Sequence, residues 1–381
     1  MLVTRAAIAD GAGAFLIDDI QVASPRDDEV LVEIRAAGIC HTDHASLSWC
    51  RPLVMGHEGA GVVREIGRGV SQVTAGDAVV LNWCIPCGSC FQCRRGETVL
   101  CETSRPAHVM ERSRGHAHAD GTHWREQPID RSFNIGTLSG LTLVRKEAVT
   151  RMPDGVPFPV AAITGCGVMT GVGSVVNVAQ VRPGESVAVL GCGGVGLNVV
   201  QGARLAGAST IVAIDTNAEA LTRARRFGAT HVVHATQGNG DVRDVTAAVR
   251  ALTGGRGADY AFEATSVPAH AFVPLLLVRD GGMALQLSGI NDLVPAQMPW
   301  FMWNKRYVTA LYGGCQPARD FPRIFAHYLD GSLQLDALVT RTYRLDELGQ
   351  ALDDMLEGRN AKGVIVMPGT GHRAPGDDDR A

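Results

Sequence analysis

The chain has 381 residues, of which 46% are hydrophobic, and it carries a formal net charge of −4 at pH 7. This length exceeds one ordinary hydrophobic core and predicts about two domains. The small acidic excess excludes an electrostatic attraction to nucleic acid or anionic membranes. No run approaches the ~20 consecutive apolar residues of a membrane span, and the N-terminus lacks the apolar core of a signal peptide. We therefore expect a cytoplasmic protein without nucleic-acid or membrane partners.

The N-terminal part of the chain is predicted to be rich in short β-strands. Segments 29–39, 59–67 and 77–83 carry apolar residues in alternation or in short blocks, with glycines near their ends. Such patterns are typical of strands, and no long helical period appears in this part. Near the C-terminus the sequence predicts two amphipathic helices followed by a closing strand, at 320–331, 345–360 and 363–368.

The middle of the chain changes to a regular alternation of strands and helices. Strands are expected at 186–193, 210–215, 231–235, 258–265, 281–288 and 306–313. Helices are expected between them at 194–207, 217–228, 241–254 and 267–280. Strands that alternate with helices form right-handed βαβ units. The predicted fold class is therefore α/β, with a doubly wound, parallel, six-stranded Rossmann sheet.

A glycine-rich turn joins the first of these strands to the first helix. The run GCGGVG at 191–196 fits G-x-G-x-x-G, with Gly191, Gly193, Gly194 and Gly196 as its glycines. In this setting the glycines permit a tight turn, close approach to a pyrophosphate, and close packing of helix on strand. Asp215 ends the next strand, 19 residues after Gly196. A carboxylate there binds a ribose hydroxyl and repels a 2′-phosphate, so the pattern favours NAD over NADP.

Five of the ten cysteines lie between positions 84 and 101. A cytosolic compartment keeps thiols reduced, so this clustering indicates metal binding and not disulfides. One set has the spacing C-x2-C-x2-C-x7-C and consists of Cys87, Cys90, Cys93 and Cys101. Four thiolates fill the tetrahedral shell of zinc, so the site is predicted to be structural. Cys84 is an alternative first ligand.

Three further residues could form a second zinc site. They are Cys40 in AAGIC, His57 in GHEGAG and Cys166 in TGCGVM. A set of two cysteines and one histidine leaves the fourth position of zinc open for water or substrate, which is the catalytic arrangement. The three residues are far apart in the sequence, so their spacing alone leaves ordinary packed side chains as the alternative.

Taken together, several motifs resemble those of the zinc-containing medium-chain alcohol dehydrogenases. The resemblance extends over nearly the whole chain and is greatest to the branch near the glutathione- and mycothiol-dependent formaldehyde dehydrogenases. It rests on GICHTD, GHEGAGVV, the four-cysteine lobe, GCGVMTGVGS, GCGGVG and LYGGC. It implies a GroES-like, β-rich catalytic domain beside the NAD-binding Rossmann domain, and two zinc ions per chain.

The resemblance also implies roles for residues around the second zinc. Cys40, His57 and Cys166 would be the catalytic zinc ligands, and Glu58 would lie close behind the metal. Asp43 would be the carboxylate that orients His57. These five residues come from three separate parts of the chain.

Further roles concern the coenzyme and the reaction. By the resemblance Thr42 would take the alcohol proton, Thr170 and Val195 would lie near the nicotinamide, and His41 and Lys362 would contact the pyrophosphate. The route of the proton beyond Thr42 is left open, either through His44 or directly to solvent. Trp49 and Trp83 would form part of the substrate pocket. In the polar stretch 105–131, Arg112 or Arg114 would hold the carboxylate of a thiol adduct, with a solvated loop as the alternative.

The resemblance leads to expected domain limits. Residues 1–166 would form the catalytic domain, with the zinc lobe at about 84–102, and 167–308 the coenzyme domain. The chain would return to the catalytic domain at 309–369 and end in a disordered tail, 370–381.

The expected activity is reversible hydride transfer between NAD and a primary alcohol or its aldehyde, including aromatic and allylic alcohols. A thiol-dependent formaldehyde dehydrogenase is the alternative, and a non-catalytic dinucleotide-binding zinc protein is a more distant one. The partner is a small-molecule alcohol or aldehyde. Relatives form dimers or tetramers, so a homodimer or homotetramer is expected. The apolar segment 298–303 is a candidate interface, with internal packing of its aromatic residues as the alternative.

Overall fold

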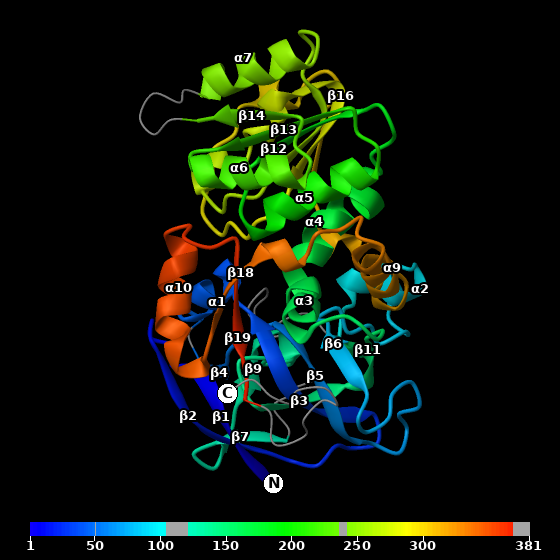
Figure 1. The fold of residues 1–381 in the computed structure, drawn as a ribbon, viewed down its shortest axis with the longest axis vertical. Coiled ribbons are helices and arrows are strands. Elements are labelled where there is room, and N and C mark those ends of the chain that lie inside the picture. Colours follow the sequence, from blue (N-terminus) through cyan, green and yellow to red (C-terminus); the bar gives the residue numbers. More distant parts are fainter. Residues whose placement is uncertain (50, 104–120, 236–241, 369–381) are drawn as a thin grey trace, which may run out of the picture.

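The computed structural model describes residues 1–49, 51–103, 121–235 and 242–368, and it consists of two lobes (Figure 1). The lobe drawn below is built on strands from both ends of the chain. Its first sheet contains β1 (Leu2–Ala9), β2 (Phe15–Val22), β4 (Leu53–Val54), β7 (Thr122–Trp124), β8 (Gln127–Pro128) and β9 (Asp130–Arg131). Its second sheet contains β3 (Glu29–Gly38), β5 (Glu58–Ile66), β6 (Ala78–Leu81), β10 (Leu141–Arg145), β11 (Val149–Arg151), β18 (Val339–Tyr343) and β19 (Lys362–Val366).

Strand β3 organises the lower lobe. It pairs antiparallel with β5, β10 and β19, so the last strand of the chain lies against one of the first. The three strand segments predicted near the N-terminus are confirmed as β3, β5 and β6, and the closing strand as β19. In Figure 1 the C-terminal strand β19 lies beside β3 in this lobe, and β18 lies on the far side of β19.

The upper lobe contains the predicted parallel sheet. Its strands are β12 (Ser186–Leu190), β13 (Thr210–Asp215), β14 (His231–His234), β15 (Ala258–Glu263), β16 (Val278–Gln286) and β17 (Arg306–Thr309). All neighbours pair in parallel, in the order β14-β13-β12-β15-β16-β17. The strands β13 and β14 lie on one side of β12, and β15, β16 and β17 lie on the other, so the strand order reverses at β12. Ligands of such sheets bind at the carboxyl ends of the strands beside this reversal.

Helices and short turns complete both lobes. The helices are α1 (His41–Ser46), α2 (Phe91–Arg94), α5 (Gly194–Leu205), α6 (Ala218–Phe227), α7 (Val242–Leu252), α8 (Pro274–Leu277), α9 (Pro317–Leu329) and α10 (Leu348–Leu356). The 3₁₀ turns are η1 (Thr98–Leu100), η2 (Ser132–Asn134), η3 (Lys146–Ala148), η6 (Pro268–His270), η7 (Met298–Phe301), η8 (Leu311–Gly314), η9 (Asp336–Leu338) and η10 (Leu345–Glu347). The predicted amphipathic helices at 320–331 and 345–360 correspond to α9 and α10.

The prediction of one helix over 267–280 is wrong. The structure has the turn η6, the four-residue helix α8, and then β16, which begins at Val278. Proline cannot donate the backbone hydrogen bond that would carry a helix on, so Pro274 separates the two short pieces. Val278 is extended and pairs with Ala258 of β15, so its backbone belongs to the sheet.

One long helical run connects the two lobes. It consists of α3 (Phe158–Ile163), the π-helical turn η4 (Thr164–Val168), α4 (Met169–Gly173) and a second π-helical turn, η5 (Ser174–Ala179). By length and hydropathy this run could cross a membrane, although glycines, threonines and serines interrupt its apolar residues. Its most apolar window is 89% buried inside the protein, so it is a core helix.

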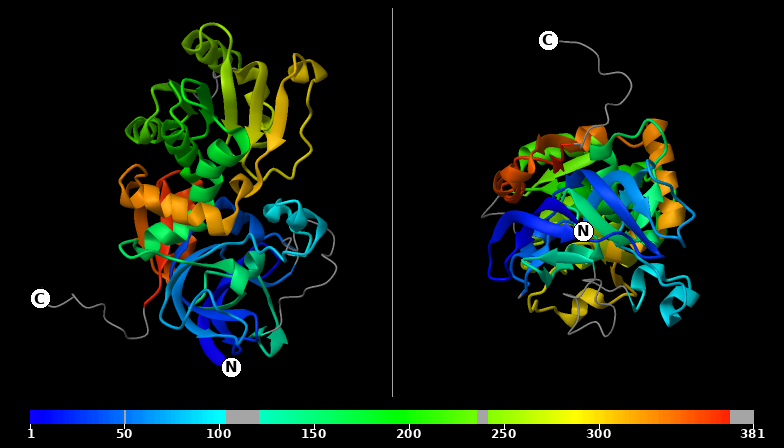
Figure 2. Two further views of the ribbon diagram at one scale, coloured as in Figure 1. Left: turned by 90° about the vertical axis from the view of Figure 1, so that its right-hand side faces the viewer. Right: turned by 90° about the horizontal axis from the view of Figure 1, so that it is seen from below.

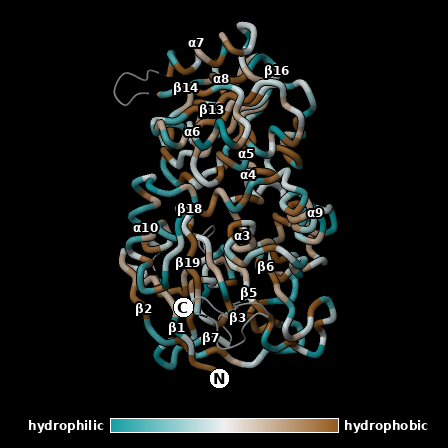
Figure 3. The backbone as a smooth tube through the Cα atoms, in the orientation of Figure 1, coloured by the Kyte–Doolittle hydropathy of each residue, from teal (hydrophilic) through white to brown (hydrophobic). Residues whose placement is uncertain are grey.

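The views in Figure 2 show how this run joins the lobes from other directions. Hydrophobic residues concentrate on the strands and on the connecting helices, as the backbone colouring in Figure 3 shows. The largest buried cluster extends across both lobes, from Val30 in β3 through Met169 to Leu197 in α5. Such a shared core fixes the position of one lobe on the other. The exact domain limits given above stay a prediction, and the tail 370–381 lies outside the described residues.

Candidate functional site

The structure brings the three predicted ligands of the second zinc together. Side-chain ligand atoms of Cys40, His57, Glu58 and Cys166 all lie within 4.8 Å of one another. Cys40 follows β3, and His57 directly precedes β5, whose first residue Glu58 pairs with Gly38 of β3. Cys166 comes from the π-helical turn η4, a feature that is frequent at functional sites.

Asp43 fixes the geometry of this cluster. Its Oδ1 lies 2.9 Å from Nδ1 of His57, and its Oδ2 accepts a 2.9 Å hydrogen bond from the backbone N–H of Cys40. The carboxylate is fully buried. With Nδ1 bonded to Asp43, the Nε2 atom of His57 remains for the cluster, and it is buried without a hydrogen-bond partner among the described residues. An imidazole nitrogen held in this way beside two thiols is a donor set that suits zinc.

The two thiols of the cluster shift each other's pKa in opposite directions. A hydrogen bond from Cys166 lowers the pKa of Cys40 well below its ordinary value, and the same contact raises the pKa of Cys166. Thr42 lies next to them, with its Oγ1 3.8 Å from Sγ of Cys40. The predicted proton acceptor is therefore adjacent to the predicted metal ligands.

Lys362 bonds to Glu58. Its Nζ donates to Oε1 of Glu58 at 2.7 Å and to the carbonyl oxygen of Ile39 at 2.9 Å. Burial raises the pKa of Glu58 to about 7, although the ammonium of Lys362 opposes the shift. Lys362 also lines the cleft between the two lobes, where a pyrophosphate could reach it. Its contact with a pyrophosphate stays a prediction. The second carboxylate oxygen of Glu58 is buried without a partner in the part of the chain that the structure describes.

The four-cysteine lobe is also assembled. The sulfurs of Cys87, Cys90, Cys93 and Cys101 lie within 4.8 Å of one another. Backbone N–H groups of three of these cysteines donate to neighbouring sulfurs at 3.3–3.4 Å. Backbone donors favour the thiolate form that zinc requires.

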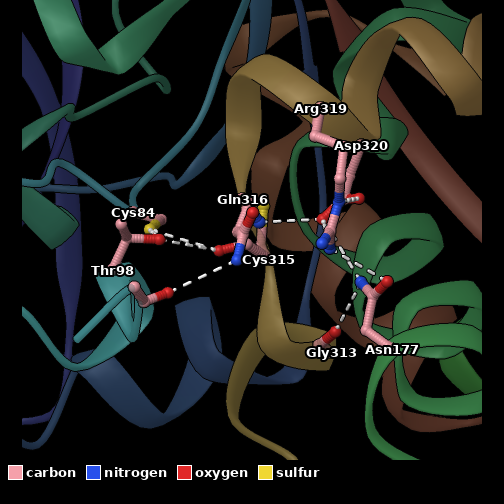
Figure 4. A network of polar contacts seen from close by, with 9 residues as sticks. Cys84, Thr98, Asn177, Gly313, Cys315, Gln316, Arg319 and Asp320 are labelled. Atoms are coloured by element: carbon pink, nitrogen blue, oxygen red, sulfur yellow. Dashed lines mark hydrogen bonds and ion pairs between the residues drawn. The ribbon is translucent and has the colours of Figure 1, made fainter. Parts of the chain in front are cut away.

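Cys84 is not part of that four-sulfur group. It is buried, and its thiol contacts the carbonyl oxygen of Cys315 at 3.7 Å and Oγ1 of Thr98 at 3.9 Å. Figure 4 shows this contact within a larger network. On the far side of the same segment, Asn177 of the connecting helix donates to the carbonyl oxygen of Gly313 and to Asp320. The segment around Cys315 thus contacts both the region beside the four-cysteine site and the helical run that connects the lower and upper lobes.

A cavity of ≈ 900 Å³ lies between the two lobes. It reaches from Cys40 at the metal cluster to Asp215 and Arg223 of the upper lobe. Predicted coenzyme residues that line it are His41, Gly191, Gly193, Gly194, Val195, Asp215 and Lys362. Gly196 and Thr170 do not line it, and both are buried close by.

The glycine turn has the geometry that a dinucleotide requires. Gly191 has φ +93°, a conformation that residues with a side chain rarely adopt. A Cβ on Gly196 would lie 1.8 Å from the carbonyl oxygen of Gly191, so only glycine lets α5 begin this close to the turn. The carboxylate of Asp215 accepts hydrogen bonds from the backbone N–H groups of Cys192, at 2.7 Å, and of Asn217, at 2.8 Å. These residues would fit a nicotinamide dinucleotide, and the N–H groups at the start of α5 would suit its phosphates.

An aromatic cluster centred on Phe133 lies beside His57. The ring of Phe133 lies 4.8 Å from the imidazole, 5.1 Å from Trp83 and 6.1 Å from Trp49. Trp83 also stacks on Tyr312 at 3.9 Å. The two predicted pocket tryptophans therefore lie close to the metal cluster. Sequence reasoning missed Phe133, because nothing in its local sequence distinguishes it.

Tyr312 was also missed, although it belongs to the quoted motif LYGGC. Its hydroxyl donates a hydrogen bond to the carbonyl oxygen of Gly165, the residue before Cys166. The side chain is buried, and the backbone has φ +51°. Tyr312 thus braces the turn that carries a proposed metal ligand. Arg112 and Arg114, considered above as anion ligands, lie outside the described residues.

Comparison with known sequence families agrees with this geometry. Residues 26–154 match the alcohol dehydrogenase GroES-like domain, and residues 194–328 match the zinc-binding dehydrogenase family. Alcohol dehydrogenase B of Mycobacterium tuberculosis is 34% identical over 379 residues, covering 96% of each chain. An S-(hydroxymethyl)glutathione dehydrogenase of Escherichia coli is also 34% identical, covering 95% of this chain and 99% of its own.

Solved structures give the same result. The benzyl alcohol dehydrogenase of Acinetobacter calcoaceticus superposes with a TM-score of 0.86 at 28% identity, over 97% of this chain and all of that one. An alcohol dehydrogenase zinc-binding domain protein from Burkholderia ambifaria has the same TM-score at 32% identity, with the same coverage. The GroES-like and Rossmann-type domains expected from the sequence are both confirmed.

Proposed function

Because the chain belongs to the zinc-containing medium-chain alcohol dehydrogenase family, we propose that it transfers a hydride reversibly between NAD and a primary alcohol or its aldehyde. One observation carries this proposal. Two thiols and one imidazole nitrogen, of Cys40, Cys166 and His57, lie within 4.8 Å of one another, and Cys40 lines the cleft that also contains the glycine turn. A non-catalytic dinucleotide-binding protein would have no need of a ligand set with an open fourth position.

The residues of the site have distinct roles in this reaction. A zinc ion held by Cys40, His57 and Cys166 would act as a Lewis acid on the substrate oxygen. NAD would lie along the glycine turn and accept the hydride. Thr42 is placed to accept the hydroxyl proton, and Asp43 keeps the imidazole of His57 in one orientation. The proton then leaves to solvent or to His44, which is exposed.

Within the primary alcohols, we propose aromatic or allylic substrates. The ring of Phe133 lies next to His57 and is itself packed against Trp83 and Trp49, and this aromatic group favours a flat, apolar group near the reacting carbon. The likeness to a structure named as a benzyl alcohol dehydrogenase supports this choice. An enzyme that oxidises the thiol adduct of formaldehyde is the second possibility, supported by the relative named S-(hydroxymethyl)glutathione dehydrogenase.

Steady-state assays with both coenzymes separate these possibilities. We expect NADH formation from benzyl and cinnamyl alcohol with kcat/KM at least about tenfold higher than from ethanol, because ring burial contributes on the order of 1.5–3 kcal/mol. Formaldehyde oxidation that depends on glutathione or mycothiol, together with slow turnover of these alcohols, would instead identify the thiol-dependent activity. No turnover of any alcohol or aldehyde by protein containing two zinc ions would refute both.

We also propose that the protein is a cytoplasmic homodimer or homotetramer. An exposed apolar group follows β16 and includes Leu293, Met298, Met302 and Trp303. It adjoins the edge strand β17, whose outer side pairs with no further strand among the described residues. Size-exclusion chromatography with light scattering measures the state, and a monomer would refute it.

A further inference from the structure

Arg223 lines the part of the coenzyme cleft that belongs to the upper lobe. It belongs to α6, the helix that follows Asp215, and it lines the cavity together with Asp215 and Ala220. Ala220 is three residues earlier on the same helix face. Helical side chains lean toward the N-terminus of their helix, so the long side chain of Arg223 extends toward the β13 end that carries Asp215.

The guanidinium of Arg223 has few partners within the chain. Its side chain is 22% exposed, and its only ion pair among the described residues joins NH1 to Glu219 at 3.8 Å, whose carboxylate is 82% exposed. Its Nε is buried and has no hydrogen-bond partner in the described part of the chain. Buried polar atoms normally have a partner, so an unpartnered guanidinium nitrogen in a cleft calls for one from outside the chain.

Opposite charges thus face the same end of the cleft. Asp215 ends β13 and is held by two backbone N–H groups, and Arg223 belongs to α6, the next helix; both residues line the cleft. Both charges act on the buried thiol of Cys192 in the glycine turn: burial and Asp215 raise its pKa, while Arg223 opposes them. Both therefore lie close to the turn where the adenosine ribose of a dinucleotide is bound.

In such folds a carboxylate selects the 2′-hydroxyl of NAD, whereas a nearby arginine accommodates the 2′-phosphate of NADP. This chain has both. We propose that Arg223 is a specificity-determining residue of the coenzyme site, which pairs with a 2′-phosphate and lets the protein bind NADP(H) as well as NAD(H), despite Asp215. The inference rests on the proposed function, because it requires that the cleft binds a nicotinamide dinucleotide.

Equilibrium binding of NADH and NADPH to the zinc-loaded protein, followed by coenzyme fluorescence and calorimetry, tests this inference without turnover. The variants are Arg223→Gln and Arg223→Lys. Arg225→Gln is the matched control, because it removes the same charge from an exposed position on the same helix. NADH binding by each variant also reports that its coenzyme domain is folded.

We expect the wild-type protein to bind both coenzymes. Arg223→Gln should weaken NADPH binding about 10- to 100-fold, the equivalent of a lost charge-assisted hydrogen bond, and NADH binding less than about threefold. Arg223→Lys should retain part of the NADPH affinity, and Arg225→Gln should change neither affinity. Equal losses for both coenzymes on Arg223→Gln, or a wild-type protein that binds NADH but not NADPH, would overturn the inference alone.

A second pair of variants tests the opposition of the two charges. Asp215→Asn should strengthen NADPH binding, because it removes the repulsion between the Asp215 carboxylate and the 2′-phosphate. This gain in affinity should be smaller in the double variant Asp215→Asn/Arg223→Gln, because the 2′-phosphate then lacks its pairing with Arg223. A gain that is the same with and without Arg223 would overturn the inference. A wild-type protein that binds neither coenzyme would refute the proposed function together with it.

Discussion

Two clusters of cysteines are brought together in different ways. The four-sulfur lobe takes its members from one short loop, Cys87 to Cys101, whereas the second cluster takes Cys40, His57 and Cys166 from three separate segments. The first cluster needs only local chain folding. The second exists only when β3, β5 and the connecting helix are packed together.

The difference explains their chemistry. A loop with four sulfur ligands fills the coordination shell of zinc and leaves no room for substrate. Three ligands from packed segments would leave the fourth position of a zinc ion free, and one of them, Cys40, lines the cleft. The four-cysteine cluster is thus expected to contribute to stability and the second cluster to catalysis. The following variants test these two roles.

The largest effect is expected from Cys40→Ala. Removing one ligand of the open site should lower kcat/KM by ~10³-fold or more, because the metal supplies several kcal/mol of transition-state stabilisation. Elemental analysis should give about one zinc per chain in place of two. Cys84→Ala, which removes a buried cysteine outside both clusters, is the control and should retain both ions. Unchanged turnover by Cys40→Ala would contradict the assigned chemistry.

Cys93→Ala should affect stability more than turnover. Structural zinc contributes folding free energy, so loss of a ligand should lower Tm by roughly 10 °C. At low temperature the folded enzyme should keep kcat within about tenfold of the wild type, since the open site is intact. Differential scanning calorimetry and zinc analysis measure both effects. An unchanged Tm accompanied by lost turnover would reverse the roles given to the two clusters.

Asp43→Asn should produce a smaller loss at the reactive cluster. The carboxamide keeps the size of the side chain, but the acceptor of the hydrogen bond from His57 loses its negative charge. Zinc affinity or activity should therefore fall 10- to 100-fold, as expected for a residue that orients a metal ligand. Competition with a chromophoric chelator measures the affinity. Asp27→Asn, which changes an exposed carboxylate paired with Arg68, is the control. Equal effects of both variants would contradict the positioning role of Asp43.

Tyr312→Phe should give the smallest effect. The ring keeps its stacking on Trp83, but the carbonyl oxygen of Gly165 loses a donor, which costs about 1–3 kcal/mol of unfolding free energy. Turnover should fall several-fold because the turn before Cys166 is no longer braced. Tyr307→Phe removes a comparable hydroxyl, bonded to Ala271, away from the metal cluster. It should destabilise the protein without changing kcat, and equal kcat losses would contradict the role of Tyr312.

Sequence patterns predicted the coenzyme domain almost element by element, because its strands are short apolar runs separated by amphipathic helices. They failed at 267–280, where two prolines divide the expected helix. They also gave no sign of the helix over 158–179, because small and polar residues interrupt its apolar sequence and most of it is buried, so no single apolar face marks it. The four-sulfur lobe was predictable because its ligands are close in sequence.

The reactive cluster was not predictable from spacing. Cys40 and Cys166 become neighbours only through tertiary packing, so their assignment depended on the family resemblance. The contacts around the cluster were even harder to predict from the sequence. The stacking of Tyr312 on Trp83, the approach of Phe133 to His57, and the bond between Lys362 and Glu58 all depend on side chains that meet across different segments.

The connecting helix has a consequence for the spacing of the two reactants. Cys166 and Gly171 lie one turn and a half apart on it, and a Cβ on Gly171 would lie 2.6 Å from the carbonyl oxygen of Val195 and 2.5 Å from Cβ of Asn198. The absence of a side chain at Gly171 therefore lets the helix that carries Cys166 pack closely on the start of α5. In the proposed reaction this packing would set the distance between the metal and the nicotinamide.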